Sequence, residues 1–228
     1  MKLLCIDSSG KTAACAVTED GVLVARNFTD SGLTHSQTLL SMTDSVLKLA
    51  GVSIDEIDEF ALTVGPGSFT GLRIGASLVM GLAGNRPVRP VPTLEALAYN
   101  LVDTNCIIIP ALDARRSQVY TAVFESKDGK ITRICEDCAM SVEDVISRIN
   151  TEYEDKNVMI LGDGAYLFGD AANVLTNVSF PEGKDLYIQG DSIAKAAEFV
   201  TPVPARDVKL SYLRMSQAER ELKEKQKK

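Results

Sequence analysis

A glycine-rich stretch is the first candidate for chemistry in this sequence. Residues 64–75 read VGPGSFTGLRIG, with four glycines in twelve residues directly after an apolar run. A turn of this kind between a strand and a helix can hold a phosphate on its backbone N–H groups. However, a Walker loop needs Lys and Ser or Thr after its last glycine, and Gly71 is followed by Leu72 and Arg73. A dinucleotide fingerprint needs glycine at position 70, which is Thr70. The spacing therefore excludes both nucleotide-binding motifs. The functional alternative that remains is weak binding of an anion at the N-terminus of the following helix.

The same glycines favour close packing. We expect a helix over residues 68–84, with Ser68 as its N-cap. Each glycine inside a helix costs roughly 0.5–1 kcal/mol relative to alanine, so Gly71 and Gly75 need a compensating contact. They lie four residues apart on one face, and the simplest interpretation is that a second helix packs there. On this hypothesis, Gly75→Leu abolishes pairing with that helix and leaves the monomer folded.

The remaining reactive side chains do not form a catalytic set. His35 is the only histidine, and no other ligand at helical spacing joins it to make a zinc site. A peptidase would need His35 as its base, and no nucleophile elbow accompanies it. Cys135 and Cys138 form one CxxC without a second pair, which favours two packed thiols. We therefore predict no catalytic, cofactor or metal site.

Composition narrows the class of protein. The 228 residues include 24 Lys and Arg against 31 Asp and Glu, a formal charge of −7. A chain of this charge is repelled by a phosphate backbone, which disfavours direct binding to nucleic acid. No leader pattern and no apolar stretch of the roughly 20 residues that span a bilayer is present. We expect a cytoplasmic protein with no membrane segment, built from two lobes of about 100 residues each.

Hydrophobic periodicity gives the elements that position these residues. The chain is expected to begin with three antiparallel strands, followed by a helix with Gly51 just past its end and a short strand. After these come the glycine-rich turn with its helix, and a further helix that follows a proline cluster. The expected ranges are residues 2–7, 12–18 and 22–28 for the strands, 34–51 for the first helix, 60–64 for the fourth strand, 68–84 for the second helix, and a third helix from Thr93.

The pattern then begins again. LLCIDSSGKTAACAVTEDG from Leu3 and IIPALDARRSQVYTAVFESKDG from Ile108 share an apolar run, an aspartate, a polar turn and a returning strand that ends in Asp-Gly. Asp7 and Asp113 occupy the same place in the two units. A third strand, a helix and a fourth strand follow at 131–139, 141–150 and 158–161, and one more helix at 192–200. We interpret this as a duplication, with chance similarity between two hairpins as the alternative.

Two lobes with this order of elements resemble the actin, sugar-kinase and ribonuclease-H-like superfamily. The resemblance implies an α/β fold with two ribonuclease-H-like lobes in tandem. We place them at residues 1–103 and 104–213, followed by a charged tail at 214–228. In that superfamily the first hairpin turn lies against nucleotide phosphates and a strand aspartate helps to hold a metal. Asp7 and Asp113 are thus candidates for an alternative function, a nucleotide-binding ATPase or small-molecule kinase. The second turn, 114–118, contains no glycine, which favours aspartates that only form turns.

Three motifs carry a closer resemblance. GPGSFTGLR, THSQTLL at residues 34–40 and DARRSQVY at 113–120 are similar to motifs of the TsaB (YeaZ) family, the bacterial subunit of the machinery that makes threonylcarbamoyladenosine beside the tRNA anticodon. The match in plan runs from about residue 1 to residue 214. Ser117 and Gln118 depart from the Gly-Glu that is usual in the family, KLSYLR from Lys209 lacks the family's proline before Tyr, and the turn after Asp7 also differs.

The resemblance implies a subunit without catalysis of its own. Its expected partners are the homologous transferase subunit TsaD and the small ATPase TsaE, with tRNA contacted only indirectly through the complex. A homodimer is expected when the partner is missing. The transferase holds a metal with two histidines spaced four apart on its first helix, and the matching positions here are His35 and Leu39. The second ligand is absent, which agrees with the prediction of no metal site.

The resemblance also implies where the transferase subunit binds. In the family the first two helices of each N-terminal lobe form a four-helix bundle. The partner interface expected from these two helices comprises Leu39, Met42, Thr43, Val46, Gly71, Leu72, Gly75, Ala76 and Val79.

Overall fold

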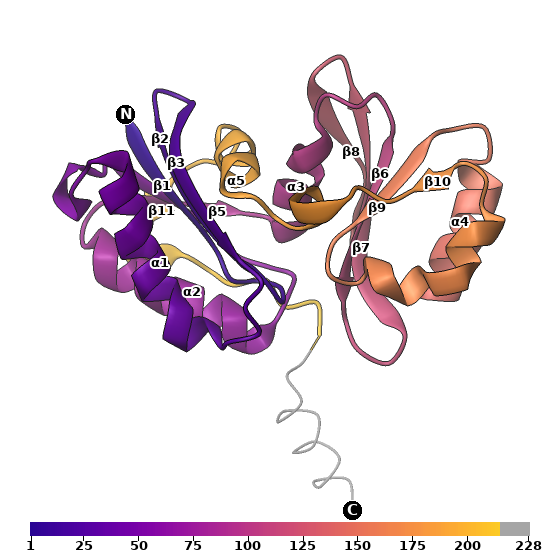
Figure 1. Cartoon of the computed structure of the whole chain (residues 1–228), viewed down its shortest axis with the longest axis horizontal. Coiled ribbons are helices and arrows are strands. Elements are labelled where there is room, and N and C mark those ends of the chain that lie inside the picture. The colour runs from indigo at the N-terminus through magenta and orange to yellow at the C-terminus, as the bar shows by residue number, and fades with distance from the viewer. Residues whose placement is uncertain (215–228) are drawn as a thin grey trace, which may run out of the picture.

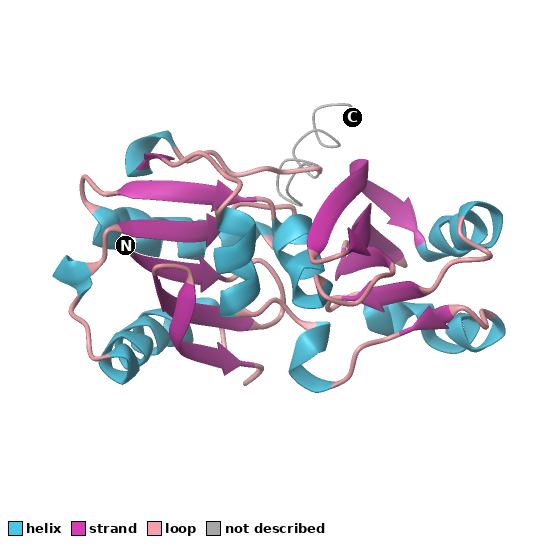
Figure 2. Ribbon diagram, turned by 90° about the horizontal axis from the view of Figure 1, so that it is seen from above, coloured by secondary structure: helices cyan, strands magenta, loops and turns pink. Residues whose placement is uncertain are grey.

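The chain forms two α/β lobes, each built on one sheet (Figures 1 and 2). The computed structural model describes residues 1–214, without the side chains of residues 170–174. The tail predicted at 214–228 therefore lies almost wholly outside the described residues. The strand orders are β11-β5-β4-β1-β2-β3 in the first sheet and β10-β9-β6-β7-β8 in the second. The α/β fold with two lobes agrees with the expectation from the superfamily.

The first lobe begins with three antiparallel strands, β1 (Lys2–Asp7), β2 (Ala13–Glu19) and β3 (Val22–Thr29). Next come α1 (His35–Ala50), the 3-10 turn η1 (Ile54–Glu56), β4 (Glu59–Thr63), α2 (Phe69–Ala83) and β5 (Pro87–Val91). The predicted ends were correct to within about two residues because local caps set them. Gly51 ends α1 in the left-handed conformation, and the Ser68 hydroxyl accepts the Gly71 N–H at 3.2 Å.

The second lobe repeats this plan. Its strands β6 (Ile107–Asp113), β7 (Gln118–Lys127) and β8 (Lys130–Ser141) are antiparallel, and α4 (Val142–Glu152) leads into β9 (Val158–Leu161), parallel to β6. The lobe ends with η3 (Ala165–Val174), β10 (Val178–Ser179) and η4 (Gly183–Leu186). The order β9-β6-β7-β8 matches β4-β1-β2-β3 of the first sheet. The predicted duplication is therefore present in the topology.

Helices cover both faces of the first sheet. Alternate residues of β1 point to opposite sides. Leu4 and Ile6 pack with α1 and α2, whereas Leu3 and Cys5 pack with α3 (Thr93–Ala98) and α5 (Gly190–Ala197). The 3-10 turn η2 (Tyr99–Leu101) continues α3. In the described residues, no helix has the length and apolar character needed to cross a membrane.

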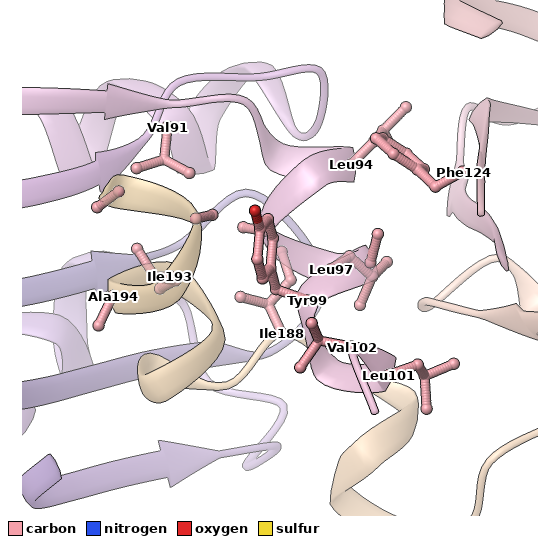
Figure 3. Packing of buried hydrophobic residues seen from close by; sticks show 14 of the residues in the cluster. Val91, Leu94, Leu97, Tyr99, Leu101, Val102, Phe124, Ile188, Ile193 and Ala194 are labelled. Carbon is pink, nitrogen blue, oxygen red and sulfur yellow. The ribbon is translucent and has the colours of Figure 1, made fainter. Parts of the chain in front are cut away.

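The helices α3 and α5 lie between the two sheets and share one core with both (Figures 1 and 3). Figure 3 shows Phe124 of β7 facing Leu94 of α3, with Ile193 of α5 on the side of the first lobe. These side chains are fully buried. The lobes are therefore joined through packed hydrophobic side chains.

The end of the chain returns to the first lobe. In β11 (Val203–Pro204), Val203 pairs with Val88 of β5, and η5 (Ala205–Asp207) follows. The predicted boundaries placed all of 104–213 in the second lobe, whereas α5 and β11 complete the first. The physical reason is that one face of β1 and β2 needs a cover, which a segment far along the chain supplies.

The strand β5 was missed because its prolines were interpreted as breaks. Proline has no backbone N–H to donate to a neighbouring strand, so it occurs in strands mainly at the edge of a sheet, where no neighbouring strand needs that hydrogen bond. The outer partner of β5 is β11, which pairs only with Pro87 and Val88. Pro90 lies beyond that pairing, next to the open edge.

Candidate partner surface and inter-lobe cleft

The residues expected to bind a partner lie inside the monomer. All nine are buried, and none of the nonglycine side chains is more than 8% exposed. The α1 residues pack on the first sheet together with Ala76 and Val79 of α2. The expected interface was thus the core face of both helices, which is not a free surface. Periodicity identified the most apolar face, and the chain's own sheet covers that face.

The glycines of α2 admit the chain's own first turn. A Cβ atom on Gly71 would overlap the carbonyl oxygen of Ser8, and one on Gly75 would lie 2.5 Å from the Ser8 hydroxyl. The Ser8 hydroxyl donates to the carbonyl oxygen of Gly71 at 2.9 Å. Gly75→Leu would therefore damage the monomer, and the expectation that it leaves the fold intact was wrong. The glycines of α2 do allow a close backbone approach, but the segment that approaches is Ser8, directly after β1, and not a second helix.

The free faces of α1 and α2 form a groove next to these buried residues. The two helices pack side by side on the outer face of the first sheet (Figure 1). We define the α1–α2 groove, of about 490 Å³, by the residues that line it: His35, Ser36, Leu39, Leu40, Phe69, Thr70, Arg73, Ile74, Ser77 and Leu78. Leu40 is 61% exposed. The Arg73 guanidinium lies 3.9 Å from the centre of the Phe69 ring. An exposed leucine beside aromatic and arginine side chains is typical of a protein interface.

A second hollow, of about 820 Å³, lies between the lobes. Its walls include the first hairpin turn at Gly10 and Lys11, the second at Asp113, and Asp163 after β9. Tyr212 and Arg214 also line it. We call it the inter-lobe cleft. It faces the carboxyl ends of β1 and β6, where open α/β sheets bind ligands.

Asp7 forms the first turn and is fully buried. Its Oδ1 accepts the Ser9 N–H at 3.0 Å, the Ser9 hydroxyl at 2.6 Å and the Thr63 hydroxyl at 2.6 Å. Its Oδ2 has no hydrogen-bond partner in the described part of the chain. Burial raises the pKa of Asp7, and these hydrogen bonds oppose that rise. Asp7 thus ties the strand end to β4, and it does not line the cleft.

Asp113 lines the cleft but is engaged by its own lobe. One carboxylate oxygen accepts the Arg115 N–H at 2.6 Å, and the other accepts the Tyr166 hydroxyl at 3.1 Å. The Arg115 guanidinium lies 3.7 Å from that second oxygen. The structure thus places Asp7 and Asp113 at matching strand ends, with only Asp113 open to the cleft.

Asp163 is the cleft residue that the sequence reasoning missed. Its Oδ2 accepts the Lys11 N–H of the first lobe at 2.8 Å, and its Oδ1 accepts the Asp113 N–H of the second at 3.0 Å. Burial raises the pKa of Asp163, while the two N–H donors act to lower it. A signal was present, because Gly162-Asp163-Gly164 follows β9 as the glycine-rich turn follows β4.

The other candidate residues have structural partners. His35 donates from Nε2 to the carbonyl oxygen of Gly10 at 2.9 Å, which holds the start of α1 over the first turn. Cys135 lies on β8, where its sulfur is 3.2 Å from an Arg148 guanidinium nitrogen. Burial raises the pKa of Cys138. The raised pKa of Cys138 does not favour a reactive thiol at that position, and the contact of His35 with Gly10 gives that histidine a structural role.

Comparisons with known proteins identify relatives that all take part in making threonylcarbamoyladenosine in tRNA, by their names. The family model described as TsaD: tRNA N6-adenosine threonylcarbamoyltransferase matches residues 29–217. The tRNA threonylcarbamoyladenosine biosynthesis protein TsaB of Bacillus subtilis (strain 168) is 30% identical over 164 residues, 71% of each chain. TsaB of Escherichia coli (strain K12) is 33% identical over 135 residues, 58% of each chain. The solved structure of YeaZ from Pseudomonas aeruginosa has a TM-score of 0.75 at 24% identity, covering 93% of this chain and 99% of that one, and supports the fold.

Proposed function

This chain belongs to the TsaB (YeaZ) family, and from that premise we propose that it is the partner subunit of the machinery that makes threonylcarbamoyladenosine in tRNA. The observation that carries the proposal is the 30% identity to the Bacillus subtilis TsaB protein over 71% of both chains. The proposed partner is the homologous transferase subunit, TsaD. The small ATPase TsaE is a further proposed partner, and contact with tRNA is indirect.

The relation between the two subunits supports direct pairing. The family model that matches this chain is described as a tRNA N6-adenosine threonylcarbamoyltransferase. Two chains of one fold can pair about an approximate two-fold axis, each using the equivalent surface. The same argument makes a homodimer the expected state of the isolated chain.

We propose the α1–α2 groove as the pairing surface. It lies on the two helices that the family resemblance assigns to the partner, and apart from the buried Leu39 at its floor it is lined by residues that are exposed or half-buried in the monomer. Leu40 and Arg73 are exposed at its rim, and Ile74 and Leu78 are half-buried. Burying a leucine that is 61% exposed, together with its half-buried neighbours, gives a hydrophobic centre of the kind that stabilises standard interfaces.

We propose that the subunit has no catalytic role of its own. Asp7 is buried with a raised pKa, and Asp113 is held by Arg115 and Tyr166. The alternative, an ATPase or a small-molecule kinase, requires a cleft that accepts polyphosphate. Lys11, Arg115 and Arg214 line the cleft together with Asp113 and Asp163, so charge alone does not decide against this alternative. What opposes it is that the carboxylate of Asp163 already takes the backbone N–H groups of Lys11 and Asp113.

The pairing surface is tested by Leu40→Glu in the full chain, purified and titrated with the separately purified transferase subunit of the same cell. The charge would have to be buried in the proposed interface, so we expect binding to weaken at least about 30-fold, the effect of a hot-spot change. Affinity is measured by titration calorimetry, and circular dichroism checks the fold.

Leu49→Glu is the matched control. Leu49 is 68% exposed on the same helix, and it follows Leu40 by nine residues, which places it about half a turn around α1. We expect wild-type affinity for this variant. If Leu40→Glu binds as well as the control, the pairing surface lies elsewhere.

A further inference from the structure

The first hairpin turn and the end of β6 converge on one carboxylate in the inter-lobe cleft. The Lys11 N–H comes from the turn between β1 and β2, and the Asp113 N–H lies at the end of β6. They belong to different lobes, 102 positions apart in the chain, and point to the two oxygens of Asp163. Backbone N–H groups that converge in this way form a receptor for an anion. In this structure the anion is a side chain of the protein itself.

The carboxylate fits tightly into this receptor. A Cβ atom on Gly10 would lie only 3.0 Å from Oδ2 of Asp163, so the turn approaches the carboxylate with no side chain between them. Gly164 is equally close to its surroundings, because a Cβ there would lie 2.9 Å from the Asp113 nitrogen. The absence of side chains at Gly10 and Gly164 therefore lets the Asp163 carboxylate lie between the first hairpin turn and the end of β6. A small tetrahedral anion has the charge and the acceptors that the same two N–H groups require.

We propose that Asp163 is an internal anion that occupies a phosphate-binding receptor in the inter-lobe cleft and keeps the cleft from accepting phosphate. The ligand class that the receptor would take without Asp163 is inorganic phosphate or pyrophosphate. Lys11, Arg115 and Arg214 also line the cleft, so the wall is not uniformly negative. Asp163 excludes such a ligand because its carboxylate takes the place and the N–H donors that the ligand would need. This inference concerns the cleft and does not depend on the proposed pairing of α1 and α2.

Other contacts keep the receptor assembled when Asp163 is removed. The Ser211 N–H donates to the carbonyl oxygen of Val64 at 2.7 Å in the first lobe. Three residues later, the Arg214 guanidinium donates to the carbonyl oxygen of Ala114 at 3.0 Å in the second lobe. The shared core of α3 and α5 joins the lobes as well. A variant at Asp163 should therefore leave both turns in place with their N–H groups free.

The test is Asp163→Ala in the full chain, with inorganic pyrophosphate as the probe and no divalent cation. We expect pyrophosphate to bind at least about 10-fold more tightly to Asp163→Ala than to the wild type in titration calorimetry. Hydrogen exchange measured by NMR should speed up at least about 10-fold at the Lys11 and Asp113 amides, because both lose their acceptor. Asp155→Ala, which removes an exposed carboxylate of the same lobe, is the control and should behave as wild type.

Two results would overturn the proposal. One is pyrophosphate binding to the wild type as tight as to Asp163→Ala, which would mean that Asp163 does not occupy the site. The other is no gain of binding in a folded variant whose two amides exchange faster. If Asp163→Ala does not fold, Asp163→Ser removes the charge and leaves a shorter side chain, so that the receptor is no longer filled. It should bind pyrophosphate more tightly than the wild type, and equal binding by the two folded proteins would also reject the internal anion.

Discussion

At the scale of single residues, Asp7 is an ionisable carboxyl group that is fully buried in the first lobe. Its side chain is 1% exposed, and three hydrogen bonds reach only one of its oxygens. Desolvation is the largest influence on its pKa and raises it. A carboxyl group whose pKa is higher in the folded state binds its proton more tightly there than in the unfolded chain. Its contribution to stability therefore falls as pH rises from about 3.9, the unfolded value, towards the raised folded value.

Asp7→Asn should remove this dependence on pH. The free energy of unfolding of the wild type, minus that of the variant, should decrease between pH 4 and pH 7.5. The decrease should be about 1.4 kcal/mol for each unit by which the folded pKa is raised. Urea denaturation at several pH values measures it.

Asp55→Asn is the control for this prediction, because Asp55 is exposed. An unpaired amide in the Asp7→Asn variant would cost stability equally at every pH, so the slope is the decisive quantity. If the difference in free energy of unfolding between wild type and Asp7→Asn does not change with pH, the folded state does not raise the pKa of Asp7.

At the scale of elements, the approach of α2 to the end of β1 organises the first lobe. Gly71 and Gly75 face Ser8, and the Ser8 hydroxyl bonds the helix backbone. The same helix contains Gly81, which is exposed and where a Cβ atom would meet nothing within 4 Å. Identical substitutions at these glycines therefore separate a packing requirement from helix propensity.

Gly71→Ala should lower the free energy of unfolding by about 1–3 kcal/mol or more, because the added methyl group overlaps the Ser8 carbonyl oxygen. Gly81→Ala should raise it by up to about 1 kcal/mol, because alanine favours the helix and nothing opposes it. Chemical denaturation of the two variants and the wild type measures both effects. Equal changes at the two positions would contradict the close packing of α2 on β1.

At the scale of the whole molecule, the lobes depend on one another. Leu94 and Leu97 of α3 pack with Phe124 of the second lobe, while α5 covers β1 and β2 of the first. The approach of α5 is close, because a Cβ atom on Gly190 would overlap Ala16. The first lobe is therefore complete only when residues from beyond the second lobe return to it.

A fragment of residues 1–103, the predicted first lobe, should not fold on its own. It lacks α5 and β11, so the apolar face of β1 and β2 stays exposed to water. We expect no cooperative transition for the fragment in calorimetry, and one transition for the full chain because both lobes share a core. A fragment with a dispersed NMR spectrum matching the full chain would show that the lobes fold independently.

The sequence by itself determined most of the helices and strands, and the family. Strand and helix ends depend on local patterns such as the Ser68 cap and Gly51, and the motifs around Gly71 and Asp113 indicated the TsaB family. These features are local, so neighbouring residues suffice to predict them. The predicted repeat of one order of elements in the two halves is also present, because both halves carry the same local pattern.

Only the tertiary structure decided which surfaces are free. The apolar faces of α1 and α2 pack on their own sheet, and Gly71 and Gly75 contact Ser8. The groove beside Leu40, which we propose as the partner surface, is left outside that packing. Asp163 gains its place from Lys11 and Asp113, which are far away in the chain. Burial and hydrogen bonding depend on neighbours brought together by folding, and periodicity within one segment does not contain that information.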